Sequence, residues 1–196
     1  ALVFRPGDAG FDQPRNGHAG EEQAEDGENG LNDNVDDVGN DLCHGVYLLT
    51  LSSDISCPRF GSGEAKGVIN ESVRGKALFV MVDVCNYNVT YSLTGNTNHM
   101  SPDDHYQNLK RIIAAIGGKG RRINVIMPFL YESRQHKRTS RESLDCALAL
   151  QELVRMGVDN IITFDAHDPR VQNAIPLSGF ETISPTYQFI KGLLRK

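Results

Sequence analysis

The sequence has no long hydrophobic run and no excess of positive charge, and these absences exclude several classes of protein. No stretch approaches the roughly 20 apolar residues that a membrane-spanning helix needs, so we predict no membrane contact. The formal net charge of −5 does not favour nucleic acid as a partner. The first residues lack a basic segment followed by an apolar one, so we see no secretory signal and expect a cytoplasmic protein.

Cysteine is scarce as well. The four cysteines are Cys43, Cys57, Cys85 and Cys146, and no two of them form a CxxC motif. We therefore predict free thiols in a reducing compartment.

A length of 196 residues with 39% hydrophobic residues is enough for one domain with a sizeable core.

Large aliphatic residues are sparse in residues 1–40. This segment holds seven glycines and ten acidic residues against two arginines. Such a composition buries too little apolar surface to offset the entropy of ordering, so we predict a poorly ordered acidic, Gly-rich segment. An acidic site for a metal or a basic partner is the alternative.

The clearest pattern in the rest of the chain is a βαβ unit. A hydrophobic run from Ile123 to Leu130 predicts a strand, and the polar loop Glu132 to Glu142 follows it. Ser143 to Met156 has helical spacing, and Val158 to Phe164 predicts the next strand. In such units ligands bind at the carboxyl ends of parallel strands, which is where the charged segments fall.

Further elements can be placed around this unit. Ser101 followed by proline and two aspartates is a strong helix start. The nearly continuous apolar run from Ala77 to Cys85 is typical of a strand in a parallel sheet. The stretch from Asn86 to Met100, rich in Asn, Thr, Ser and Gly, predicts a long loop. We also predict strands over 44–53 and 179–183 and a final helix from Ser184.

Three loops carry candidate binding residues. In Cys57 to Gly67, the glycines allow either close approach to a ligand, with Phe60 stacking on a ring and Glu64 accepting hydrogen bonds, or a simple hairpin turn. Five of the eleven residues from Glu132 to Glu142 are cationic or histidine, which suits phosphate oxygens or an exposed loop without a ligand. The third loop contains Asp165, His167 and Asp168, whose side chains are of types that could bind a divalent cation.

Several motifs occur in the order known from one enzyme family. They are Arg59-Phe60-Gly-Ser-Gly-Glu64, Asn70-Glu-Ser-Val-Arg-Gly-Lys76, Met127-Pro-Phe, Arg134-Gln135 with its basic tail, and Ile161-Ile-Thr-Phe-Asp-Ala-His167. Over about residues 57–190 the chain resembles the amino-terminal half of ribose-phosphate pyrophosphokinase. The resemblance implies an α/β domain of phosphoribosyltransferase-like fold over residues 41–183, a parallel sheet with helices on both faces. Residues 184–196 would then form a helix at the junction to a second domain.

The resemblance also implies a reaction and a set of site residues. The family moves the β,γ-diphosphoryl group of ATP to the 1-hydroxyl of ribose 5-phosphate, with Mg²⁺, and works as an oligomer whose subunits share sites. A homo-oligomer is therefore expected here. The resemblance assigns Phe60, Glu64, Arg134 and Gln135 to ATP binding and His167 to the metal and phosphates. Together with the charged loops, the predicted ATP-binding residues are Phe60, Glu64, Arg134, Gln135, His136 and Lys137, the predicted metal ligands are His167 and Asp168, and no residue is assigned as catalytic.

The chain departs from the family pattern at several points. Ser62, His136 and Asp168 replace residues usual in the family, and the stretch 86–100 is longer and more polar than usual. The loop that binds ribose 5-phosphate in the family's second half has no counterpart in these 196 residues. Three hypotheses follow: the nucleotide-binding part of a divergent pyrophosphokinase, inactive alone; a non-catalytic, synthetase-associated regulatory subunit; or a nucleotide-binding domain with another role.

Overall fold

The structure, a computed structural model, describes residues 46–48 and 55–195. The predictions for residues 1–40, for Cys43 and for most of the strand over 44–53 concern residues outside this range. Cys57, Cys85 and Cys146 are free thiols, as predicted. No helix in the described part of the chain has the length and apolar character needed to cross a membrane.

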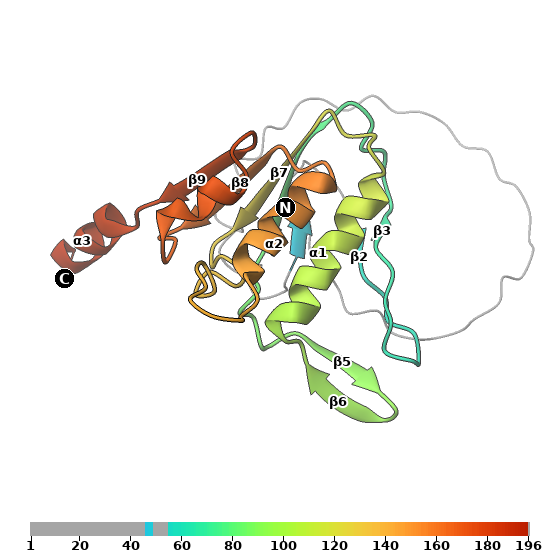
Figure 1. The fold of residues 1–196 in the computed structure, drawn as a ribbon. Helices are drawn as coiled ribbons and strands as arrows, with labels where there is room; N and C mark the ends of the chain where they lie inside the picture. The colour runs from blue at the N-terminus through green and yellow to red at the C-terminus, as the bar shows by residue number, and fades with distance from the viewer. Residues whose placement is uncertain (1–45, 49–54, 196) are drawn as a thin grey trace, which may run out of the picture.

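A five-stranded sheet forms the centre of the molecule (Figure 1). Its strands lie in the order β1-β4-β7-β8-β9, and β4, β7, β8 and β9 run parallel. The predicted α/β fold with a parallel sheet is therefore confirmed, with the exception that β1 pairs antiparallel to β4. The strand bounds are β1 Val46–Leu48, β4 Ala77–Val82, β7 Arg122–Met127, β8 Asn160–Phe164 and β9 Gly179–Ile183.

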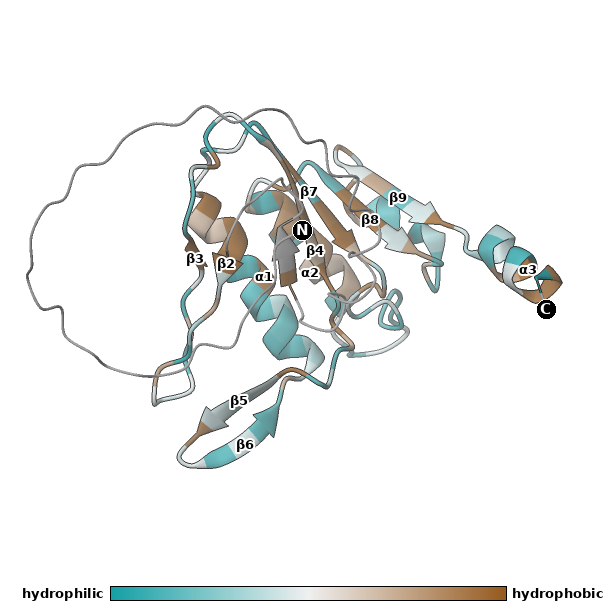
Figure 2. Ribbon diagram, turned by 180° about the vertical axis from the view of Figure 1, so that it is seen from behind, coloured by the Kyte–Doolittle hydropathy of each residue, from teal (hydrophilic) through white to brown (hydrophobic). Residues whose placement is uncertain are grey.

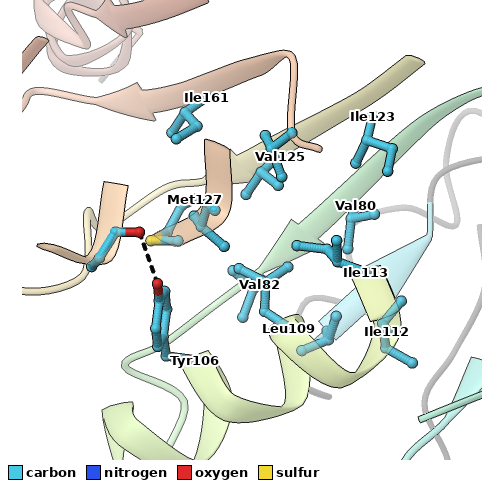
Figure 3. Packing of buried hydrophobic residues seen from close by; sticks show 14 of the residues in the cluster. Val80, Val82, Tyr106, Leu109, Ile112, Ile113, Ile123, Val125, Met127 and Ile161 are labelled. Carbon is cyan, nitrogen blue, oxygen red and sulfur yellow. Dashed lines mark hydrogen bonds between the residues drawn. The ribbon is translucent and has the colours of Figure 1, made fainter. Parts of the chain in front are cut away.

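Two helices cover one face of this sheet. They are α1 (Pro102–Ile116) and α2 (Asp145–Arg155), which connect β4 to β7 and β7 to β8. Parallel neighbours joined by right-handed crossovers place successive helices on the same side. Figure 3 shows α1 side chains packed on the sheet. The buried residues at this interface include Leu78, Val80, Val82, Leu109, Ile112, Ile113, Ile123, Val125, Met127, Leu150, Leu153 and Ile161.

The opposite face of the sheet carries partly exposed apolar side chains. Phe79, Phe164 and Ile183 are 38%, 43% and 46% exposed. Figure 2 views this side and shows apolar residues along β7, with α1 and α2 behind it. The family resemblance predicted helices on both faces, but within the described residues both long helices lie on one face.

The start of α1 is determined by its sequence. The Ser101 side chain accepts a hydrogen bond from the Asp104 backbone N–H at 3.2 Å, and the Asp104 carboxylate accepts one from the Ser101 backbone N–H at 3.0 Å. This reciprocal capping box satisfies two free backbone donors. Gly117, in a left-handed conformation (φ 59°), ends the helix. The position of α1 is therefore predictable from local residues.

Two β-hairpins complete the fold. β2 (Ile55–Ser56) pairs antiparallel with β3 (Val68–Ile69), so the loop Cys57 to Gly67 closes a hairpin, one of the two alternatives. β5 (Thr90–Leu93) pairs antiparallel with β6 (Asn96–His99), so the prediction of a loop throughout residues 86–100 is wrong. The cause is the turn Thr94-Gly95, where both residues have positive φ (50° and 81°), as a tight hairpin turn requires.

The chain continues after β8 through a 3₁₀ helix and a final helix. The 3₁₀ helix, η2 (Pro169–Ala174), was not predicted, whereas the final helix is confirmed as α3 (Thr186–Leu194). None of the α3 residues is buried. Figure 1 shows α3 extending away from the edge of the sheet, beyond β9.

Candidate functional site

The carboxyl ends of β7 and β8 enclose a cavity of about 310 Å³. Because these strands are parallel neighbours, the segments that follow them lie at the same edge of the sheet. The sequence placed its two charged clusters there, and the cavity does bring Arg134 and His167 together. The lining residues are Phe129, Leu130, Ser133, Arg134, Phe164, Asp165, Ala166 and His167.

A tight turn after β7 places Arg134 on the rim of this cavity. The Ser133 N–H donates to the Leu130 carbonyl at 3.1 Å, and the Gln135 N–H donates to the Glu132 carbonyl at 2.9 Å. Glu132 takes up a left-handed conformation (φ 56°) that reverses the chain. Leu130 and Ser133 are buried, so they anchor the turn in the domain. Arg134 is exposed, and its guanidinium group faces solvent.

Gln135 and Lys137, two predicted ATP ligands, differ in what they contact. The Gln135 side chain donates to the Ser143 carbonyl at 2.7 Å, which closes the cationic loop onto the start of α2. Its amide is therefore already used in holding the loop. Lys137 is exposed, and its side chain makes no hydrogen bond or ion pair to any described residue. Its ammonium group is available to a ligand.

The segment after β8 positions His167. Asp165 has a left-handed conformation (φ 48°), and its N–H donates to the Ile183 carbonyl at 3.0 Å. The Ala166 N–H donates to Thr182 Oγ1 at 2.9 Å. These bonds tie the turn to β9. The exposed His167 ring lies edge-on to the His136 ring, with centroids 5.1 Å apart, so the two predicted loops meet here.

Asp168 is engaged by a neighbour that sequence analysis did not consider. Its Oδ2 accepts a hydrogen bond from Arg170 Nη2 at 2.6 Å, and its Oδ1 accepts from Arg170 Nε at 3.0 Å. His136 Nε2 lies 3.4 Å from the same carboxylate. Hydrogen bonds from Arg170 hold the pKa of Asp168 well below its usual range. The carboxylate is thus ionised and paired.

This pairing bears on the predicted magnesium site. Mg²⁺ requires near-octahedral oxygen ligands and is usually bound by one or two carboxylates together with substrate phosphates. Among residues 55–195, no group of three or more His, Cys, Asp or Glu side chains is arranged to hold a metal. The residues here fit a Mg²⁺ ion that is coordinated mainly by phosphates, with His167 nearby. To coordinate the ion directly, the Asp168 carboxylate would have to break its ion pair with Arg170.

A third strand end contributes groups that the sequence did not single out. Asp83 and Cys85 follow β4, and the Cys85 N–H donates to Asp83 Oδ1 at 3.1 Å. Partial burial raises the pKa of the Cys85 thiol, and the negative charge of Asp83 raises it further. The positive charge of Arg134 opposes this rise. Arg134, which follows β7, therefore also acts electrostatically on the end of β4. The position of Asp83 directly after an apolar run was the signal available in the sequence.

Phe60 and Glu64 lie elsewhere. They belong to the tip of the β2–β3 hairpin, where the Phe60 side chain is 52% exposed. The Glu64 carboxylate accepts a hydrogen bond from the Ser62 hydroxyl at 2.9 Å. Figure 1 shows this tip and the loop between β7 and α2 apart from each other along the lower edge of the domain. The structure does not bring the two halves of the predicted ATP site together within one chain.

Comparisons with known proteins identify the family of this chain. Residues 40–157, more than half of the chain, match the family described as the N-terminal domain of ribose phosphate pyrophosphokinase. Ribose-phosphate pyrophosphokinase 1 of Schizosaccharomyces pombe is 32% identical over 121 residues, 61% of this chain and 26% of that protein. Ribose-phosphate pyrophosphokinase B of Dictyostelium discoideum is 28% identical over 136 residues, 68% of this chain and 38% of that protein.

A solved structure shares the fold. The crystal structure of phosphoribosylpyrophosphate synthetase from Mycobacterium smegmatis superposes with a TM-score of 0.60 over 74% of this chain and 44% of that one, at 21% identity. The chain thus spans less than half the length of these relatives. On the strength of the matching domain, the chain belongs to the ribose-phosphate pyrophosphokinase family and corresponds to its N-terminal domain.

Proposed function

We propose that this chain supplies the nucleotide side of a ribose-phosphate diphosphokinase site. The reaction would transfer the β,γ-diphosphoryl group of ATP to the 1-hydroxyl of ribose 5-phosphate, giving phosphoribosyl pyrophosphate and AMP. The observation that carries the proposal is the shared cavity at the ends of β7 and β8, which has Arg134 on one side and His167 on the other. Both residues follow parallel strands, where ligands of such sheets bind.

The side chains at this edge suit the chemistry of phosphoryl transfer. That reaction needs the phosphates to be positioned and their charge to be neutralised, more than it needs covalent chemistry from the protein. Arg134 offers a planar pair of donors to a phosphate, and the unpaired Lys137 offers a second cation. His167 lines the same cavity and would donate a hydrogen bond to a phosphate oxygen. Mg²⁺, when bound with the nucleotide, would supply the remaining positive charge.

The separation of Phe60 and Glu64 from this cavity supports an oligomer. Because the hairpin tip is exposed and lies apart from the loop between β7 and α2 of the same chain, it is free to reach the base of a nucleotide bound to a neighbouring copy. We propose a homo-oligomer in which each nucleotide site is completed in this way. Ribose 5-phosphate would bind a second domain, as the family resemblance implies.

One observation favours a second candidate function, a non-catalytic subunit associated with active synthetase. The Asp168 carboxylate, a predicted metal ligand, is neutralised by Arg170. A chain that had exchanged metal binding for this internal ion pair would keep the subunit contacts and lose part of the catalytic site. Magnesium dependence of nucleotide binding separates the two functions.

The test is calorimetric titration of the chain with ATP, with and without Mg²⁺. Arg134→Ala should weaken binding by about 1.5–3 kcal/mol, as expected for the loss of a hydrogen bond to a charged group. Arg138→Ala, an exposed cation of the same loop, is the matched control and should change the affinity much less. His167→Ala should reduce the magnesium dependence. Equal affinity of the wild-type chain and the Arg134→Ala variant would refute the proposed site.

A further inference from the structure

The guanidinium group of Arg59 joins three separate parts of the chain. Arg59 Nη1 donates to the Gly63 carbonyl at 2.9 Å, across the turn of its own loop. Arg59 Nη2 donates to Asp104 Oδ1 at 3.0 Å, at the start of α1. The Tyr91 ring of β5 lies against the same group, with the guanidinium carbon 3.9 Å from the ring centroid. Arg59 therefore connects the β2–β3 tip, α1 and the β5–β6 hairpin.

The loop Arg59 to Glu64 has few other contacts to fix its shape. Inside it, the Phe60 N–H donates to the Glu64 carbonyl at 2.7 Å, and the Gly63 N–H donates to the Phe60 carbonyl at 2.9 Å. Gly61 and Gly63 make the backbone permissive, and Gly63 has a positive φ of 89°. A tip of this composition holds a single conformation only if neighbouring groups restrain it.

The β5–β6 hairpin provides that restraint. Tyr91 and Leu93 are two residues apart on β5 and so project from the same face of the hairpin. Tyr91 covers Arg59, and the Leu93 methyl groups come within 3.4 and 3.5 Å of the point where a Cβ at Gly63 would stand. Tyr91 and Leu93, two of the three half-buried residues of β5, are thus directed at the Arg59–Glu64 loop.

The hairpin is itself anchored to the domain at its base. The Met100 N–H donates to the Val89 carbonyl at 2.9 Å, and both side chains are buried. The His99 ring contacts the Tyr87 carbonyl through Nδ1 at 2.6 Å. An isolated two-stranded hairpin is marginally stable, so this anchoring allows β5 to act as a fixed support. This segment is also the one that is longer and more polar than the family pattern.

We propose that the β5–β6 hairpin is a positioning element for the Arg59–Glu64 loop. Tyr91, stacked on Arg59, and Leu93, packed at Gly63, hold the loop in the shape that presents Phe60 outward to the base of a nucleotide bound by a second copy. Tyr91 and Leu93 are positioning residues, because they act through the loop and touch no ligand. The nucleotide part of this statement rests on the function proposed above, whereas the restraint of the loop does not.

The restraint is tested by amide hydrogen exchange in the full chain. Tyr91→Leu removes the aromatic ring and keeps an apolar residue in the strand. Amide exchange at Phe60 and Gly63 should then become about two- to fivefold faster, because this is the factor expected for the loss of one cation–π contact. Tyr91→Phe should restore the wild-type rates. Tyr87→Leu, which alters an exposed tyrosine outside the strands, is the matched control and should leave the loop unchanged.

Two outcomes would overturn the proposal. Unchanged loop exchange in Tyr91→Leu, with the Met100 amide still protected, would show that the hairpin does not restrain the loop. If Met100 loses protection, Leu93→Ala serves as the second variant, and wild-type loop exchange in that variant would refute the restraint.

The nucleotide part has its own readout. ATP titration of the oligomer should show weaker binding in Tyr91→Leu and wild-type affinity in Tyr91→Phe. A variant with a loosened loop and unchanged ATP affinity would refute the presentation of Phe60. Absence of ATP binding by the wild-type chain would refute the proposed function, while the exchange rates would still decide whether the hairpin holds the loop.

Discussion

At the scale of single residues, Asp168 and Arg170 determine the charge at the end of β8. In Arg170→Ala the Asp168 carboxylate loses the side-chain donors of Arg170 but keeps the hydrogen bond from the Arg170 backbone N–H, so its pKa should rise part of the way toward the usual aspartate range. NMR titration of the Asp168 carboxyl carbon measures this change. Arg138→Ala is the control, since Arg138 makes no described contact with Asp168. Identical Asp168 titration in the wild-type chain and Arg170→Ala would contradict the assignment of this pair.

The sign of the pH effect follows from the lowered pKa. In the folded chain Asp168 stays ionised to a lower pH than in the unfolded chain. Its contribution to stability is therefore complete above the unfolded-state pKa and is lost as the pH falls through the lower folded-state pKa. Arg170→Ala should reduce this acid-range dependence, because only the backbone hydrogen bond from residue 170 remains, and should leave the stability difference between the two proteins constant at higher pH.

The sequence alone predicts that Arg134 and His167 lie at strand ends, but it does not reveal the ionic pairing of Asp168. The first two depend on which residues follow apolar runs, which a sequence displays directly. The pairing of Asp168 depends on the 3₁₀ turn at Pro169–Ala174, which folds Arg170 back over the carboxylate. A turn of six residues has no hydrophobic period that would reveal it. Arg59 was equally hidden, because its partner Asp104 is 45 positions away.

At the scale of elements, the contact between β3 and α1 depends on Gly67. A Cβ at this position would overlap the Arg111 carbonyl of α1, and a backbone group cannot move aside as a side chain can. Gly67→Ala should lower the free energy of unfolding by about 1–3 kcal/mol, measured by urea denaturation. Gly192→Ala in α3, where nothing lies within 4 Å, is the matched control and should be neutral or slightly stabilising.

Gly67→Ala with wild-type stability would mean that α1 and β3 are less tightly packed than the structure shows. The same contact explains why the sequence around Val68 and Ile69 does not reveal β3. The two residues of β3 are too few to show alternation, and the strand exists because β2 and α1 hold it. The longer elements were predictable because each carries its own pattern. Examples are the apolar run that became β4 and the capping residues of α1.

The β5–β6 hairpin was missed for a related reason. Its residues are mostly uncharged and polar, and β6 (Asn-Thr-Asn-His) offers no apolar face. The hairpin depends on the Thr94-Gly95 turn and on contacts of β5 with Arg59 and Gly63, which lie some 30 positions earlier in the chain. Tertiary contacts therefore override weak local propensity in this segment.

At the scale of the whole molecule, α3 leaves an apolar surface unpaired. Its side chains Tyr187, Phe189, Ile190, Leu193 and Leu194 are 52–82% exposed, and no α3 residue is buried. Phe189 and Leu193 are four positions apart, so they lie on one face of the helix. Apolar patches of this kind on soluble domains are usually covered by another chain or domain. We predict that the chain self-associates through α3.

The double variant Phe189→Ser/Leu193→Ser tests this prediction. It should lower the mass measured by light scattering toward the 21.6 kDa of one chain, because the two largest apolar groups on that face are lost. Gln188→Ser, at an exposed polar position of the same helix, is the control and should leave the mass unchanged. A wild-type chain that is a monodisperse monomer would contradict the prediction. Association that persists in the double variant would place the contact elsewhere, and the exposed Phe60 loop would then be the surface to alter next.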